Sequence, residues 1–153
     1  METRPEGKAM MQVRHLLQKK GTQVFSVGPE DSVYQALESL AHHDIGALAV
    51  VESGQLVGIF SERDYARKVV LQGLTSKTTR VRALMSSNPV TAAPETSIAD
   101  CMRLMTEHRI RHLPILEAGQ LAGLVSIGDI VKGLLAEQEA LIGDLRDYIG
   151  GKS

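Results

Sequence analysis

The amino-acid sequence contains an internal repeat with a shift of 65 positions, and this repeat constrains the fold more than any other feature. The stretch 29–68 aligns with the stretch 94–133. Identical pairs include Ser32/Ser97, His43/His108, Gly54/Gly119, Gln55/Gln120, Ser61/Ser126 and Asp64/Asp129. Upstream, the segment 13–16 corresponds to 81–84, with a three-residue insertion around 19–21. A repeat of this length indicates one structural unit present twice.

The spacing of apolar residues changes in the same order in both copies and predicts the same elements. Short strands are expected at 24–27 and 90–92. Amphipathic helices are expected next, because apolar residues recur at helical spacing after Ser32 and after Ser97. Gln35 and Asp100 stand three residues after these serines, and their side chains can reach back to free N–H groups. This arrangement is typical of a helix N-cap.

A pair of apolar runs then follows in each copy, at 47–51 and 56–60 and again at 113–116 and 121–125. The connections ESGQ and EAGQ contain glycine and predict hairpins with four-residue connections. Because the runs lack polar alternation, we expect strands covered on both faces. A second helix is expected from Ser61 and from Ser126, the latter running on as an amphipathic tail to Gly150.

Composition excludes several classes of function. The chain has 17 Lys+Arg against 18 Asp+Glu and only 3% aromatic residues, so we expect no nucleic-acid binding. The apolar run 47–51 is far shorter than the roughly 20 residues that span a bilayer, so we expect no membrane partner. The single Cys101 lacks a CxxC partner, lies on an apolar helical stripe and suits a core position in a cytoplasmic protein.

Signatures of catalysis are also missing from the sequence. It contains no GxGxxG, GxxxxGK[ST] or GxSxG motif, and its histidines do not stand at metal-ligand spacing. We therefore expect neither an enzyme nor a metal site.

The order strand, helix, strand, strand, helix occurs twice, with GIFSERD and GLVSIGD opening the final helices and RIRHLPI before a middle strand. This pattern resembles a pair of cystathionine-beta-synthase (CBS) domains, a Bateman module, over about Val13 to Leu135. The resemblance implies an α/β (α+β) fold of two tandem β-α-β-β-α repeats packed about a pseudo-twofold axis with two related clefts. We expect an N-terminal extension at 1–12, repeats at 13–75 and 81–135, and a C-terminal amphipathic helix at 136–153.

The resemblance also implies binding residues. In similar modules the Asp of the motif G-h-x-S/T-x-x-D, where h is apolar, holds ribose hydroxyls, and the Ser or Thr lies near ribose or phosphate. The matching residues here are Ser61 and Asp64, and Ser126 and Asp129. A carboxylate can accept from two vicinal hydroxyls. The same arrangement is also a plain helix cap that needs no ligand.

The two copies differ where similar modules meet phosphates. Arg111 and His112 stand before Leu113-Pro114 in the second copy, whereas the first copy has Gly46 and Ala47. The clefts should therefore differ in phosphate affinity. Arg63 and Arg109 could add charge at the same mouth or be solvated surface charges, and Lys19 and Lys20 could reach a second phosphate, as in a dinucleotide, or form a solvated turn. An apolar slot for adenine could be formed by Val24, Phe25, Val90, Thr91 and Leu113, which core packing would explain equally well.

These observations lead to one main hypothesis about function. The chain is expected to be a regulatory signal-transduction protein that binds AMP, ADP, ATP or NAD(H), forms a homodimer and signals to an unidentified protein target. The first alternative is an interaction or dimerisation module with a vestigial cleft. The second is a sensor of S-adenosylmethionine, which lacks phosphates.

Overall fold

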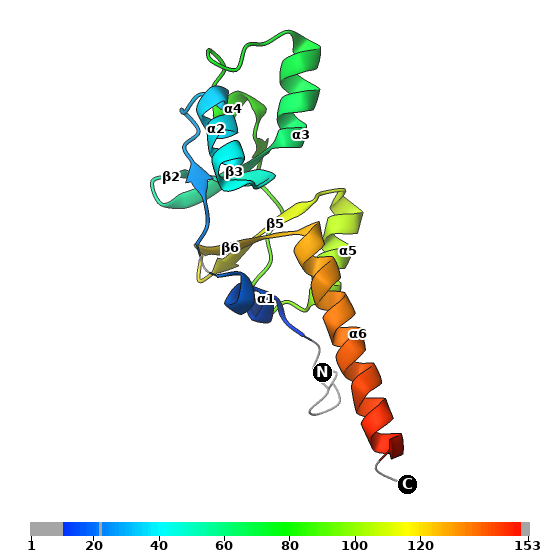
Figure 1. Ribbon diagram of the computed structural model, residues 1–153. Helices are drawn as coiled ribbons and strands as arrows, with labels where there is room; N and C mark the ends of the chain where they lie inside the picture. Colours follow the sequence, from blue (N-terminus) through cyan, green and yellow to red (C-terminus); the bar gives the residue numbers. More distant parts are fainter. Residues whose placement is uncertain (1–10, 22, 151–153) are drawn as a thin grey trace.

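The chain folds into two lobes in the computed structural model, which describes residues 11–21 and 23–150 (Figure 1). The elements, in chain order, are α1 Val13–Lys20, β1 Ser26–Val27, α2 Val33–His43, β2 Ala47–Glu52, β3 Gln55–Ser61, α3 Glu62–Asp64, the π-helix η1 Tyr65–Val70, α4 Val81–Leu84, β4 Ser86–Ser87, α5 Ile98–His108, β5 His112–Glu117, β6 Gln120–Ser126 and α6 Ile127–Gly150. The mixed helix and strand content confirms the predicted fold class.

The two sheets repeat one pattern of strand pairing. The first sheet has the order β1-β2-β3-β4, with β1 parallel and β3 antiparallel to β2, and the second sheet pairs β5 with β6. The strand predicted at 90–92 is reduced to one parallel bridge between Ala92 and Ile115. That bridge repeats, 65 positions later, the pairing of Val27 with Val50.

Both predicted hairpins are present, but their connections have two residues rather than four. Glu52 pairs with Gln55 and Glu117 pairs with Gln120, which leaves only Ser53-Gly54 and Ala118-Gly119 in the turns. All four turn residues have positive φ angles between 52° and 79°. This conformation matches the right-handed twist of the strands, and glycine adopts it without steric cost.

The predicted helix starts are capped as expected. The Ser32 hydroxyl accepts from the backbone N–H of Gln35, whose side chain accepts in return from the Ser32 backbone. The Ser97 hydroxyl also accepts from the backbone N–H of Asp100, but the Asp100 side chain pairs with Arg103 instead of reaching back to the Ser97 backbone. α6 begins after Ser126 and continues without a break to Gly150, so the amphipathic tail extends the last helix of the second repeat.

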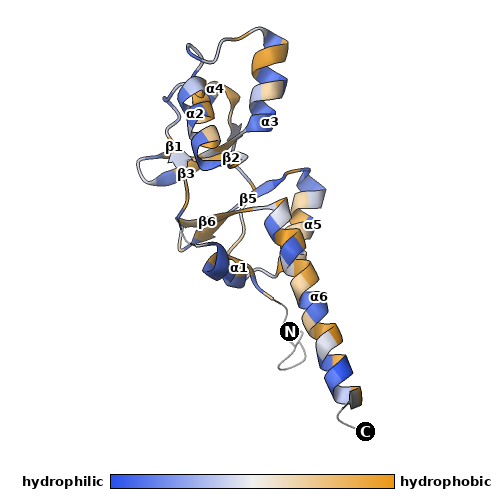
Figure 2. Cartoon of the chain, viewed as in Figure 1, coloured by the Kyte–Doolittle hydropathy of each residue, from blue (hydrophilic) through white to orange (hydrophobic). Residues whose placement is uncertain are grey.

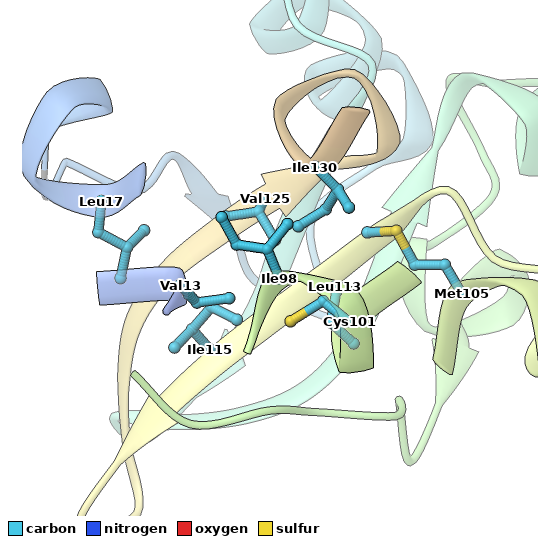
Figure 3. Packing of buried hydrophobic residues seen from close by; sticks show 9 residues of the cluster. All are labelled: Val13, Leu17, Ile98, Cys101, Met105, Leu113, Ile115, Val125 and Ile130. Carbon is cyan, nitrogen blue, oxygen red and sulfur yellow. The ribbon is translucent and has the colours of Figure 1, made fainter. Parts of the chain in front are cut away.

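Each lobe contains the helix that precedes the other repeat in the sequence: α1 packs in the second lobe, and α4 packs in the first. Val13 and Leu17 of α1 are buried with residues of α5, β5, β6 and α6, the second-repeat elements, as Figure 3 shows. Val81 and Leu84 of α4 are buried instead with residues of α2, β2 and β3 in the first lobe. The repeats of the sequence and the packed lobes therefore differ by an exchange of one helix.

The exchange is reciprocal in its hydrogen bonds. The backbone N–H of Val13 donates to Thr96 O at 2.9 Å, and that of Val81 donates to Asp31 O at 2.9 Å. Arg14 forms an ion pair with Glu95, and the corresponding residues Arg82 and Glu30 form another. Both docking sites use the same contacts. The helix that leads into each repeat therefore holds that repeat against the opposite lobe.

Outside this exchange, the lobes meet through β3 and β6. The C-terminal half of α6 extends away from both lobes (Figure 1). Over residues 11–21 and 23–150, no helix has the length and apolar content needed to cross a membrane.

Candidate functional site

A cleft of about 350 Å³ opens beside the end of β3, and we call it cleft one. The first lobe contributes the end of β3 and the helix that follows it. The second lobe contributes the turn between α5 and β5, and the segment after β4 closes one side. The lining residues are Gly46, Ile59, Ser61, Glu62, Arg63, Asp64, Arg67, Lys68, Ser86, Pro89, Val90, Arg109, Ile110, Arg111 and His112.

A second cleft of about 410 Å³, cleft two, lies beside the end of β6. Its lining residues are Lys20, Gln23, Val24, Phe25, Asp44, Ile45, Gly46, Ala47, His112, Leu124 and Ser126. The repeat shift of 65 relates the two linings: Ser126 corresponds to Ser61, Leu124 to Ile59, and Asp44–Ala47 to 109–112. The molecule therefore contains the two related clefts that the duplicated sequence predicts.

Ser61 and Asp64 form a capping box at the wall of cleft one. Asp64 Oδ2 accepts from the backbone N–H and from the hydroxyl of Ser61, each at 3.0 Å, and the Ser61 hydroxyl accepts from the Asp64 backbone. Asp64 Oδ1 lies 3.6 Å from Lys68 Nζ, which itself donates to Leu84 O. The cap holds the carboxylate in place through one oxygen while the residue lines the cleft.

Asp129 has a different environment. Its Oδ2 accepts from the backbone N–H of Ser126 at 2.8 Å and lies 2.5 Å from Lys20 Nζ. Burial alone would raise the pKa of Asp129, but the hydrogen bonds from Lys20 and Ser126 and the charge of Lys20 outweigh it and lower the pKa. Asp129 lines the groove between α1 and α6, next to cleft two.

Charge distinguishes the two clefts. Cleft one gathers the cationic side chains of Arg63, Arg67, Lys68, Arg109 and Arg111 against the carboxylates of Glu62 and Asp64. Among the described residues that line cleft two, the charged side chains are Lys20 and Asp44. Arg109 and Asp44 occupy equivalent left-handed C-cap positions, with φ of 55° and 53°, after α5 and α2. One helix end therefore presents a cation to cleft one, and its counterpart presents an anion to cleft two.

His112 forms part of the wall of both clefts. Its ring lies over Gly46, so that a Cβ on Gly46 would stand 3.5 Å from both Cε1 and Nε2. Burial, followed by the nearby charge of Lys20, lowers the pKa of His112, with Asp129 acting in the opposite direction. Position 46 of the first repeat, where the second repeat has Arg111, is therefore in van der Waals range of this imidazole.

The structure brings most of the predicted site residues together. Ser61, Arg63, Asp64, Arg109, Arg111 and His112 line cleft one, and Ser126 joins His112 in cleft two. Of the adenine-slot residues, Val90 lines cleft one and Val24 and Phe25 line cleft two. Leu113 is fully buried in the core, and Thr91 lines neither cleft.

Sequence reasoning missed Arg67 and Lys68 in cleft one. Both stand within one turn of Asp64, so helical spacing alone could have placed them on its side of the helix. Lys20, predicted to reach a second phosphate or to be a solvated turn, lines cleft two.

Cys101 is completely buried, as its place on the apolar stripe predicts. Burial, with a smaller contribution from Asp100, raises the pKa of its thiol to about 11. A thiol in such a setting is a weak nucleophile. Among the residues that the structure describes, no three His, Cys, Asp or Glu side chains gather in a group that could hold a metal ion.

Comparison with known proteins agrees with this architecture. The family model for the CBS domain matches twice, at residues 13–71 and 81–136, and the chain belongs to the CBS domain family. It is 42% identical over 127 residues to the mitochondrial CBS domain-containing protein CBSX3 of Arabidopsis thaliana, covering 80% of this chain and 62% of that relative. The CBS domain-containing protein YhcV of Bacillus subtilis is 35% identical over 119 residues, covering 78% of this chain and 84% of YhcV.

A solved structure from Burkholderia ambifaria MC40-6, described as a signal-transduction protein with CBS domains, superposes with a TM-score of 0.80 at 46% identity. The match covers 84% of this chain and 96% of that one. The fold and the two clefts thus define a CBS-domain pair, a kind of module that is mostly regulatory.

Proposed function

We propose that this chain is a regulatory sensor that binds a phosphate-bearing adenosine compound, such as AMP, ADP, ATP or NAD(H), in cleft one. One observation carries the proposal: a fixed carboxylate, Asp64, lines the same cleft of about 350 Å³ as Arg109 and Arg111. A carboxylate accepts from a sugar diol, and guanidinium groups pair with phosphate. The output would be a change in shape or in partner contact rather than catalysis.

The geometry supports a definite orientation of the ligand. The Ser61 backbone and hydroxyl hold Oδ2 of Asp64, so the ribose hydroxyls would approach Oδ1, beside Lys68 Nζ at 3.6 Å. Val90 and Ile59 supply apolar surface for a base. The phosphates would meet Arg109 and Arg111 from the other lobe, so a bound nucleotide would connect the two lobes.

Cleft two differs from cleft one in the charges that it offers a ligand. Asp44 stands where cleft one has Arg109, and Gly46 stands where it has Arg111. S-adenosylmethionine, which carries a carboxylate but no phosphate, does not need those two arginines and is the alternative ligand for cleft two. The solved structure of the CBS domain pair of protein MJ0100 holds 5′-methylthioadenosine and S-adenosyl-L-methionine, and that pair shares this fold at 21% identity and a TM-score of 0.74.

Calorimetric titration of AMP, ATP, NADH and S-adenosylmethionine tests the proposal. Asp64→Asn keeps an acceptor for the helix cap but removes the charge, and Arg111→Ala removes one phosphate partner. Each should weaken nucleotide binding by roughly 10- to 150-fold, because a charged hydrogen bond contributes about 1.5 to 3 kcal/mol. Asp100→Asn makes the same chemical change outside both clefts and should leave binding unchanged.

An interaction module with a vestigial cleft gives a different result in a thermal-shift screen. A ligand at 100 times its dissociation constant stabilises the folded state by about 2.7 kcal/mol, so a sensor would melt several degrees higher. An interaction module would melt at the same temperature with every nucleotide. That outcome, together with unchanged heats in the titration, would remove the sensor proposal.

A homodimer is the second part of the proposal, and the exposed face of α6 supports it. Val131, Leu135, Ile142, Leu145 and Ile149 follow alternating steps of four and three residues, with Gln138 in the same series. These five apolar side chains are 41% to 70% exposed, and apolar bands follow the protruding helix in Figure 2. Such spacing is typical of a coiled-coil seam.

Charge favours an antiparallel pair of α6 helices from two copies. If Ile142 packs against Leu145 of the second copy, Glu139 comes beside Arg146 of that copy, and the contact occurs twice by symmetry. A parallel pair would place Glu139 and Arg146 beside Leu134 and Leu141 instead.

Cytoplasmic location stays a prediction, and the name of the Arabidopsis relative assigns that protein to mitochondria.

A further inference from the structure

We infer that Lys20 determines the ligand specificity of cleft two by acting as an internal counter-ion that competes for Asp129. This inference rests on the proposed function, because it assumes that cleft two accepts an adenosine compound. It begins from a difference between the two clefts. Both carboxylates accept from the serine of their own cap and have a lysine nearby, but Lys68 follows Asp64 closely in sequence, whereas Lys20 reaches Asp129 from α1.

The cation that serves Asp129 comes from an unusual place. In the first repeat, Lys68 lies four residues after Asp64, in the π-helix η1 that follows α3, with its Nζ 3.6 Å from the Asp64 carboxylate. The equivalent position in the second repeat is Gly133, which is buried. A Cβ there would stand 2.7 Å from Ile98 Cδ1 and 3.0 Å from Leu16 Cδ2, so the close packing of α1 and α5 leaves no room for a lysine.

The helix α1 that excludes a lysine at 133 supplies one itself. Lys20 is the last residue of α1, and its Nζ lies 2.5 Å from Asp129 Oδ2. The Lys20 side chain is 43% exposed and that of Asp129 is 27% exposed, so solvent and ligands can reach the pair. Lys20 also lines cleft two, whereas its neighbour Lys19 lines only the groove between α1 and α6.

Two consequences follow for a ligand that enters cleft two. Asp129 lines the adjoining groove, which shares Lys20 with cleft two, so a sugar diol that reaches Asp129 from cleft two must compete with the ammonium group for its carboxylate. This competition weakens the binding of an uncharged nucleoside. A ligand that carries phosphate offers Lys20 a replacement anion, so the ammonium can leave Asp129 without losing its own partner. Lys20 therefore selects for ligands that bring a negative charge, although no other lysine or arginine stands among the described residues that line cleft two.

The test compares AMP with adenosine, two probes that differ by one phosphate. Titrations use the Asp64→Asn protein, in which binding at cleft one is weakened, so that the remaining heat reports cleft two. This Asp64→Asn protein, the parent of the variants below, should prefer AMP over adenosine by about tenfold or more. Lys20→Met should bind adenosine several-fold more tightly and lose most of this preference.

Two matched variants accompany the test. Lys20→Arg keeps the positive charge and should keep the preference for AMP, and Lys19→Met removes a charge one residue away and should behave like the parent. If Lys20→Met leaves the preference within about twofold of the parent, or weakens both probes equally, the inference is wrong. If the parent binds neither probe while the wild type binds AMP, the inference also fails, but the proposed function of cleft one stands.

Discussion

The imidazole of His112 lies directly over Gly46, with Cε1 and Nε2 each 3.5 Å from the place where a Cβ on that glycine would stand. The two residues come from different lobes and from non-equivalent positions of the repeat, and both line both clefts. This contact therefore places one titratable group between the two candidate binding sites.

The first prediction concerns pH. The pKa of His112 lies below its ordinary 6.5 in the folded protein, so the unfolded chain binds the proton more readily. The stabilising effect of the neutral ring is complete above about pH 6.5 and is lost as the pH falls from there toward the lowered pKa. In urea melts between pH 5 and pH 8, His112→Gln should reduce the dependence of the free energy of unfolding on pH below about pH 6.5. His108→Gln, at an exposed position of α5, is the control, and an unchanged slope in the His112 variant would contradict the prediction.

The second prediction concerns a trade between stability and binding at Arg109. Arg109 is a non-glycine residue at φ 55°, a conformation that costs an L-residue about 1 to 2 kcal/mol relative to glycine. Arg109→Gly should raise the free energy of unfolding by up to about 1 kcal/mol and weaken ATP binding at cleft one. Asp44→Gly, at the equivalent helix end, should give a similar stability gain without weakening ATP binding at cleft one.

The third prediction follows from the exchange of α1 and α4. Because each lobe's core contains a helix that precedes the other repeat, the lobes should unfold together in one transition. Leu84→Ala removes a side chain that is 1% exposed in the first lobe and should cost about 2 to 5 kcal/mol. Amide hydrogen exchange should then show lower protection in both lobes. A loss confined to the first lobe would mean that the lobes unfold independently.

The fourth prediction tests the antiparallel pairing of α6. Glu139→Arg should shift the protein toward monomer in analytical ultracentrifugation, because Arg146 of the second copy would then face a like charge. The double variant Glu139→Arg with Arg146→Glu should restore the dimer, since the pair is only reversed. Leu145→Glu should prevent dimerisation in either background. A monomeric wild type, or a double variant no better than the single one, would argue against this interface.

The repeat and its helical and strand periodicities were enough to predict the two-fold β-α-β-β-α order, the caps at Ser32 and Ser97, and the burial of Cys101. These features depend on contacts near in sequence, or on a pattern that occurs twice. The exchange of α1 and α4 was not predictable in this way, because Val13 and Val81 have the same apolar character whichever lobe they enter. The reduction of the strand at 90–92 to a single bridge at Ala92 was not predictable either, because a three-residue apolar stretch does not show how many of its residues pair.

The candidate site was predictable in part for the same reason. Ser61 and Asp64 carry a motif, and Arg111 differs visibly from its partner Gly46, so the sequence itself points to them. The ion pair between Lys20 and Asp129 joins residues that are 109 positions apart and lie on different helices, so no local sequence pattern indicates it. Thr91 was expected near the adenine slot, but the backbone places it outside both linings.

The reciprocal docking of α1 and α4 has a consequence for how copies of this chain can associate. The surface that receives Val13 and Leu17 recognises a short amphipathic helix and a few backbone groups, and an identical helix from another molecule offers the same features. Trading that helix between molecules would bury the same apolar atoms and preserve the same hydrogen bonds. The fold thus carries a built-in route to domain-swapped assemblies at high concentration.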